Sequence, residues 1–190
     1  MVNLSNLTSS YSKDFYLSHF SKSLQLLSQQ ENCLAYDRAV EPNAQKRTVQ
    51  LKQFGIKIGI PDNFRTLLRN NGEVWILNPV DYDLIACTAR GGRGGRGLYY
   101  QFVKRIPNSK HLSLKTFALN QYGVNTSIQP YKFYHLNGIL AESSLGRGTI
   151  SSSFFLKIPP TEHIVEISAG CDCDVKAKDI IGFLETISLL

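Results

Sequence analysis

Residues 149–168, TISSSFFLKIPPTEHIVEIS, decide the fold that we predict for this chain. Two runs rich in β-branched and aromatic residues, Thr149 to Ile158 and His163 to Ser168, lie on either side of Pro159-Pro160. Such runs, bounded by turn residues, are typical of β-strands. A connection this short joins antiparallel strands, since a parallel crossover needs about a dozen residues or more. The stretch therefore predicts two neighbouring antiparallel strands.

Five more runs of the same kind precede this stretch and are separated by turns rich in Gly, Pro and Asn. They are Glu73 to Leu77, Tyr82 to Ala89, Leu98 to Arg105, Leu112 to Leu119 and Tyr131 to Ala141. Short connections between consecutive strands favour an antiparallel meander over parallel units. The sequence thus predicts a β-meander of about seven strands, which can curl toward a barrel.

Apolar periodicity predicts a helix at each end of the chain. Residues 11–30 have apolar side chains at three- and four-residue spacing, and so does Val175 to Leu190, with Asp174 placed as its N-cap. Before the meander, alternation on either side of Phe54-Gly55 predicts a strand with a bulge or bend, and Pro61 to Leu68 predicts one to two helical turns. We therefore expect an α+β fold with a helix on each flank of the sheet.

Length and composition fit one globular domain that covers residues 1–190. The chain is 43% hydrophobic and 19% charged, and no stretch has the roughly 18 apolar residues of a membrane span. The opening residues lack the pattern of a secretory signal. Four cysteines at uneven positions do not suggest a disulfide framework. These features favour a reducing, cytoplasmic location without a membrane partner.

Positive charge is concentrated in the middle of the chain. The 58 residues from Leu84 to Ala141 contain no Asp or Glu but eight Lys and Arg, within a formal net charge of +6. Such a span predicts a surface that faces a polyanion. The alternative is that these cations are only the solvated outer positions of strands.

The most distinctive motif of that span is residues 89–97, ARGGRGGRG. Glycine lets the backbone approach a ligand closely, and arginine offers paired donors to phosphate and a plane that stacks on bases. The motif resembles the arginine-glycine-glycine repeats of RNA-binding tails. That resemblance implies phosphate contacts from Arg90, Arg93 and Arg96. The alternative is a flexible hairpin tip with solvated arginines.

Aromatic and basic residues follow the motif directly. Tyr100, Phe102 and Lys104 share strand parity, so we expect them on one face, with the two rings stacking on unpaired bases. Further cations would extend this groove, namely Arg105, Lys110 and Arg147.

A second glycine turn, residues 143–149 with sequence SSLGRGT, precedes the deciding stretch. Two glycine-arginine loops in a basic antiparallel protein resemble the glycine-rich loops of the RNA-binding subunits of CRISPR ribonucleoproteins. The resemblance implies an accessory subunit whose partners are RNA and other protein subunits. The chain departs from that family in lacking the paired strand-helix-strand pattern of its ferredoxin-like fold.

The serines after this turn allow an enzymatic interpretation. Arg90-Gly91, Ser151-Ser152-Ser153 and Glu166 resemble the Arg, Ser-Thr-Ser, Glu order of ADP-ribosyltransferases. That order implies a phosphate held by Arg90, a nicotinamide pocket shaped by the serine strand and a ribose oriented by Glu166. The chain departs from it at Ser152, which replaces a threonine, and has no Glu-x-Glu or Gln-x-Glu at Glu166.

Cys171 and Cys173, with His163 upstream, are the candidate metal ligands. Structural zinc sites prefer wider Cys spacing and a second ligand pair. We therefore expect no metal and no cofactor, and interpret the two cysteines as small residues in a turn.

These patterns favour a cytoplasmic, non-catalytic protein that binds RNA or another nucleic acid. Two alternatives stay open. One is a small-molecule pocket, with or without catalysis, inside a curled sheet. The other is a protein-interaction subunit with a basic face.

Overall fold

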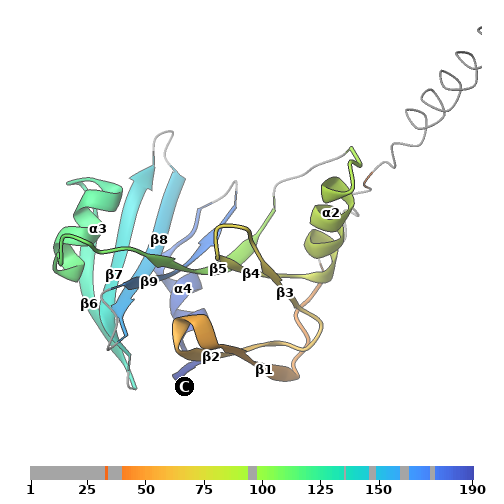
Figure 1. Cartoon of the computed structure of the whole chain (residues 1–190), viewed down its shortest axis with the longest axis horizontal. Coiled ribbons are helices and arrows are strands. Elements are labelled where there is room, and N and C mark those ends of the chain that lie inside the picture. Colours follow the sequence, from red (N-terminus) through yellow and green to blue (C-terminus); the bar gives the residue numbers. More distant parts are fainter. Residues whose placement is uncertain are drawn as a thin grey trace, which may run out of the picture.

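The computed structural model describes residues 33, 40–93, 98–134, 136–145, 149–158, 163–171 and 174–190. Its main element is a seven-stranded antiparallel sheet with the order β3-β4-β5-β9-β8-β7-β6 (Figure 1). The strands are β3 (Arg65–Leu68), β4 (Val74–Leu77), β5 (Tyr100–Ile106), β6 (Ser127–Phe133), β7 (Leu136–Leu145), β8 (Thr149–Lys157) and β9 (Ile164–Gly170). The predicted α+β class and seven-stranded antiparallel sheet are confirmed, and the sheet is not closed into a barrel.

A second sheet has three strands in the order β1-β2-β10. These are β1 (Lys46–Leu51), β2 (Ile56–Pro61) and β10 (Ile187–Leu189). A 3-10 turn, η1 (Lys52–Phe54), joins β1 to β2, and Gly55 then adopts a φ of +69°, which glycine accepts without a steric penalty. The single strand predicted on either side of Phe54-Gly55 is instead a hairpin, because the chain reverses at η1 and Gly55 and β1 pairs antiparallel with β2.

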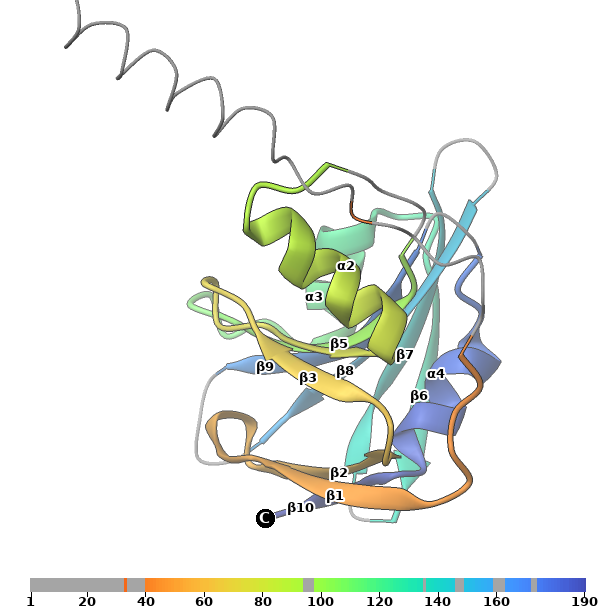
Figure 2. The same cartoon turned by 90° about the vertical axis from the view of Figure 1, so that its right-hand side faces the viewer.

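Both faces of the seven-stranded sheet are covered. Among the described residues the α-helices are α2 (Pro79–Ala89), α3 (Leu114–Tyr122) and α4 (Ala177–Leu184). Figure 2 shows α2 and α3 on one face, and α4 with the three-stranded sheet on the other. Along β9, Val165 and Ile167 join the larger core beside α4 and β2, whereas Ile164 joins the smaller core beneath α3. The face that carries α2 and α3 is named the helix-covered face below.

Two segments predicted as strands are helices. Tyr82 to Ala89 belongs to α2, and Leu112 to Leu119 overlaps α3. The side chains of Asn78 and Ser113 each accept a hydrogen bond from the backbone amide three residues on, at 2.9 and 3.1 Å. Such caps satisfy amides that a helix start otherwise leaves unbonded. The strand predictions were wrong because β-branched and aromatic content is a weaker signal than capping and packing.

Two strand boundaries also differ from the prediction. Tyr131 to Ala141 is not one strand: it spans the end of β6 and the start of β7, and Tyr134 between them has a φ of +47°. Pro61 to Leu68 does not form helical turns, because its last residues form β3 and pair with β4. In both cases pairing with a distant strand, which local sequence does not reveal, sets the conformation.

The C-terminal segment is not a single helix. α4 ends at Leu184, and the chain then forms β10, whose backbone pairs with β2. Asp174 does not cap α4, because its carboxylate accepts a hydrogen bond from the backbone amide of Ile150 at 2.9 Å. Lys176 holds the N-cap position instead. The helix predicted over residues 11–30 lies outside the described residues.

We expect Gly138→Ala in β7 to destabilise the protein. A methyl group there would press on the Phe155 carbonyl and the Phe154 ring of β8, and such overpacking costs about 1–3 kcal/mol. Gly182→Ala in α4 is the matched control: nothing lies within 4 Å of the added methyl, and alanine favours a helix by up to about 1 kcal/mol over glycine. Urea unfolding measures both free energies. Equal stability of the two variants would contradict this packing.

Candidate functional site

Strand β5 places three predicted contact residues on the helix-covered face. Tyr100, Phe102 and Lys104 share this face, while Val103 between them is buried in the larger core on the other side. The ring centroids of Tyr100 and Phe102 are 6.0 Å apart, and Lys104 Nζ lies 5.2 Å from the Phe102 centroid. The shared parity is therefore as predicted. Arg105, the next residue along, is exposed and alternates to the opposite face.

Trp75 of β4 extends this aromatic row. Its ring stacks on Tyr100 with 3.9 Å between centroids, and Arg69 Cζ lies 4.3 Å from the same Trp75 centroid. Two groups this close to one ring must cover its opposite faces. The Tyr100 ring also fills the space that a side chain at Gly170 would take, and burial followed by the charge of Glu73 raises the pKa of its hydroxyl. Arg69 therefore forms the outer end of the stack.

Glu166 of β9 is a fully buried carboxylate on the same face. Its Oε1 accepts hydrogen bonds from Tyr122 Oη at 2.7 Å and Ser153 Oγ at 2.8 Å, and its Oε2 pairs with Lys104 Nζ at 2.9 Å. A buried charge needs these partners, because leaving it unpaired costs about 3–5 kcal/mol. Burial and then the Glu166 charge raise the pKa of Tyr122, so its hydroxyl stays protonated and donates. The cluster therefore links α3 to β5, β8 and β9.

The cluster leaves little for a substrate to contact. Ser153 and Glu166 come together, as their order in ADP-ribosyltransferases implies, but both are fully buried and bonded to each other. Ser152 lies on the opposite face, where its Oγ donates to Glu142 at 3.1 Å. Lys104 neutralises Glu166, so a phosphate at Lys104 would compete with a buried ion pair. In this arrangement Ser153, Glu166 and Lys104 stabilise the fold and are not available to a substrate.

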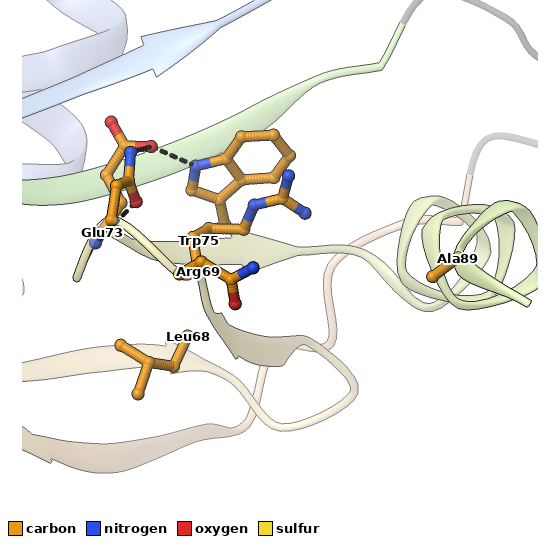
Figure 3. A pocket seen from close by; sticks show the side chains of 7 residues that line it. Leu68, Arg69, Glu73, Trp75 and Ala89 are labelled. Atoms are coloured by element: carbon orange, nitrogen blue, oxygen red, sulfur yellow. Dashed lines mark hydrogen bonds between the residues drawn. The ribbon is translucent and has the colours of Figure 1, made fainter.

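An open pocket of about 490 Å³ lies between the turn that joins β3 to β4 and the end of α2. It is lined by Leu68, Arg69, Asn70, Asn71, Glu73, Trp75 and Ala89. Figure 3 shows the Arg69 and Trp75 side chains together on one side and Ala89, the last residue of α2, across from them. Glu73 Oε2 accepts hydrogen bonds from Trp75 Nε1 at 3.0 Å and from Asn71 Nδ2 at 3.3 Å. The pocket is thus lined by the Arg69 cation stacked on Trp75, the hydrogen-bonded Glu73 carboxylate and the side-chain amides of Asn70 and Asn71.

Residues 90–93, named the arginine turn below, follow α2 directly. The backbone amides of Arg90 and Gly92 both donate to the Cys87 carbonyl at 3.1 Å, and the Cys33 amide donates to the Arg93 carbonyl at 2.8 Å. Cys33 and Cys87 form a disulfide, and a side chain at position 92 would collide with both sulfurs. The disulfide and these hydrogen bonds hold the backbone from which Arg90 and Arg93 project into solvent.

The expectation that the cysteines form no disulfide framework is wrong. Besides the bond between Cys33 and Cys87, Cys171 is disulfide-bonded. Disulfides persist mainly in oxidising environments. Cysteine usage therefore no longer argues for a reducing compartment.

The remaining predicted contacts are scattered. Lys110 is exposed before α3 and lines a second pocket of about 210 Å³ with Asn108 and Gln121 among its other residues. Arg105 faces away from the helix-covered face, as noted. Arg96 and Arg147 lie outside the described residues, so the structure does not place them beside the others.

Sequence reasoning did not identify Arg69, Trp75 or Tyr122 as part of the site. Their positions depend on the register of β4 with β5 and on the packing of α3, which no local pattern reveals. Nor does alternation single out Trp75, because its neighbours Val74, Ile76 and Leu77 are all apolar.

No protein-family model matches the chain, and a search of curated proteins finds no significant match. In the part of the chain that the structure describes, no helix is long and apolar enough to cross a membrane. Nor do the described residues group three or more His, Cys, Asp or Glu side chains in a way that could hold a metal ion.

Breaking the buried ion pair tests its structural role. We expect Lys104→Met to lower the free energy of unfolding by about 3 kcal/mol, because Glu166 is left charged and unpaired. Adding Glu166→Gln should recover most of the loss, since the amide oxygen still accepts from Tyr122 and Ser153. The matched control is Arg105→Met on the opposite face, which should cost less than about 0.5 kcal/mol. Similar losses for Lys104→Met and Arg105→Met in urea unfolding would refute the role.

The disulfide should contribute strongly to stability. Cys33 and Cys87 are 54 residues apart. Without a cross-link that closes a loop of this length, the unfolded chain gains conformational entropy, which lowers the stability of the folded state by about 4 kcal/mol. We expect Cys33→Ser with Cys87→Ser to lower the melting temperature by roughly 10 °C in a protein of this size. Peptide mapping without reductant should recover the linked pair from the parent. An unchanged melting temperature, or the absence of that linkage, would show that the bond does not form.

Proposed function

We propose that this protein binds single-stranded nucleic acid, RNA above all, without catalysing a reaction on it. The observation that carries the proposal is the position of the arginine turn directly after Ala89, which lines the pocket shared with Arg69 and Trp75. Arginines contact phosphates, and aromatic and guanidinium planes stack on unpaired bases. Both kinds of group meet at the end of α2.

The charges around this site support a polyanionic ligand. Arg90 and Arg93 are exposed and, within the described residues, form no ion pair with an acid. Elsewhere on the surface, Lys110 before α3 and Lys115 within α3 are exposed as well. The span without Asp or Glu supplies the arginine turn, β5 and α3, so only acids from elsewhere in the chain can offset these cations. Glu166 offsets Lys104 in this way.

The proposal includes assembly with other protein subunits, as in a ribonucleoprotein. A small-molecule ligand of the pocket and an acidic protein partner are the competing functions. Both would use Arg69 or the arginine turn. They differ from a nucleic acid in salt dependence, because each phosphate neutralised on a single strand adds about −0.7 to the slope of log affinity against log salt.

Replacing the two exposed arginines tests the proposal. We expect Arg90→Gln with Arg93→Gln to weaken binding of the full chain to a labelled oligouridine of about 16 nucleotides. Loss of two phosphate contacts should flatten the salt slope by about 1.4 and reduce affinity roughly tenfold or more near 50 mM salt. Fluorescence anisotropy over a salt series measures both quantities.

The matched control removes the same charge from the other side of the molecule. Lys46→Gln with Lys52→Gln changes two exposed residues of β1 and η1, and should leave the affinity and the slope nearly unchanged. Equal effects of the two double variants would mean that oligouridine is attracted only by the net positive charge of the protein and not by the arginine turn. If the parent binds no oligouridine at any salt concentration, the proposed function is wrong.

A further inference from the structure

The pocket beside the arginine turn has the size and the surfaces of a site for one nucleotide unit. Its volume of about 490 Å³ falls within the roughly 300–1,000 Å³ of small-ligand sites. We propose that this pocket holds one unpaired nucleobase of a bound strand, stacked at the Arg69–Trp75 pair, with the adjoining phosphate at Arg90. This inference rests on the proposed function and gives that site a specific ligand chemistry.

A nucleobase site first needs a planar surface for stacking, and the stack of Tyr100, Trp75 and Arg69 provides one. The Tyr100 ring covers one face of Trp75. On its other side the Tyr100 ring packs closely against Gly170, which holds it in place. Arg69 covers the other face of Trp75 and itself lines the pocket. A planar base entering the pocket extends this stack on the guanidinium, or takes its place over the indole. Stacking on aromatic and arginine planes is the usual way in which proteins hold unpaired bases.

The charges set the orientation of the nucleotide. Glu73 is fixed at the Trp75 side of the pocket, because its carboxylate accepts hydrogen bonds from Trp75 Nε1 and Asn71 Nδ2 and its backbone amide donates to Asn71 Oδ1. Its carboxylate repels a phosphate, so the base occupies this side. The phosphate lies across the pocket at α2, where Arg90 follows Ala89. Asn70, which is exposed and lines the pocket, offers an amide that can both donate to and accept from a base edge.

Trp75 is the chain's one tryptophan, so its fluorescence reports on this pocket alone. We expect oligouridine and uridine 5′-monophosphate to change the Trp75 emission of the full-length protein, and ribose 5-phosphate and inorganic phosphate to leave it unchanged. This arm uses the parent protein and so does not depend on how any variant folds. Equal responses to ribose 5-phosphate and to the nucleotide would mean that the pocket recognises phosphate only, and would overturn the inference.

Two variants at neighbouring positions test the stacking. Arg69→Gln removes the stacked cation directly after β3, whereas Arg65→Gln removes an exposed cation of β3 that does not line the pocket. We expect Arg69→Gln to weaken oligouridine binding roughly tenfold, as loss of one stacked base does, and Arg65→Gln to change it less than about twofold. An abasic oligomer of equal length should bind Arg69→Gln and Arg65→Gln alike.

The outcomes separate this inference from the proposed function. If the parent binds oligouridine but Trp75 does not respond, and the two variants bind equally, the base site is wrong while nucleic-acid binding stands. If Arg69→Gln weakens the abasic oligomer as much as oligouridine, Arg69 is only a phosphate contact and the base site is again wrong. If the parent does not bind oligouridine at all, both proposals fail.

Discussion

The pairing of β5 with β9 is the interaction on which the rest of the structure depends. It joins the β3-β4-β5 part of the sheet to the β9-β8-β7-β6 part, and its register places Lys104 opposite Glu166. A slip of one residue would turn every side chain of β9 to the other face. Glu166 would then enter the larger core without a partner, and Ile167 would leave it. The ion pair therefore favours the one register in which the buried carboxylate is neutralised.

That register also decides which cations remain for a ligand. Lys104 belongs to the buried cluster with Glu166, Tyr122 and Ser153, so its charge serves the fold. The arginine turn lies beyond the sheet, where the disulfide and backbone hydrogen bonds fix the main chain while the guanidinium groups stay in solvent. Rigid backbone with exposed cations lowers the entropy cost of ordering a contact. The polyanion contact that we propose therefore lies at the end of α2 and not along β5.

The two faces of the sheet have different roles because they are covered differently. α4 and the three-stranded sheet bury one face continuously, with Ile56, Ile58 and Ile60 of β2 filling the larger core. On the helix-covered face, α3 covers one end and α2 contacts the other, at β3 and β4. Polar and aromatic side chains occupy this second face, and its open pocket forms where α2 ends. A binding site there disturbs none of the larger core.

The sequence alone determined the α+β class and the antiparallel sheet, because alternation and turn residues act within a few positions of one another. It also determined that Tyr100, Phe102 and Lys104 share a face. Only the tertiary structure decided that the strand-like run before the arginine turn is a helix, since capping and packing outweigh β-propensity there. It alone paired Lys104 with Glu166, stacked Arg69, Trp75 and Tyr100, and joined Cys33 to Cys87. These contacts link residues far apart along the chain, so no local pattern encodes them.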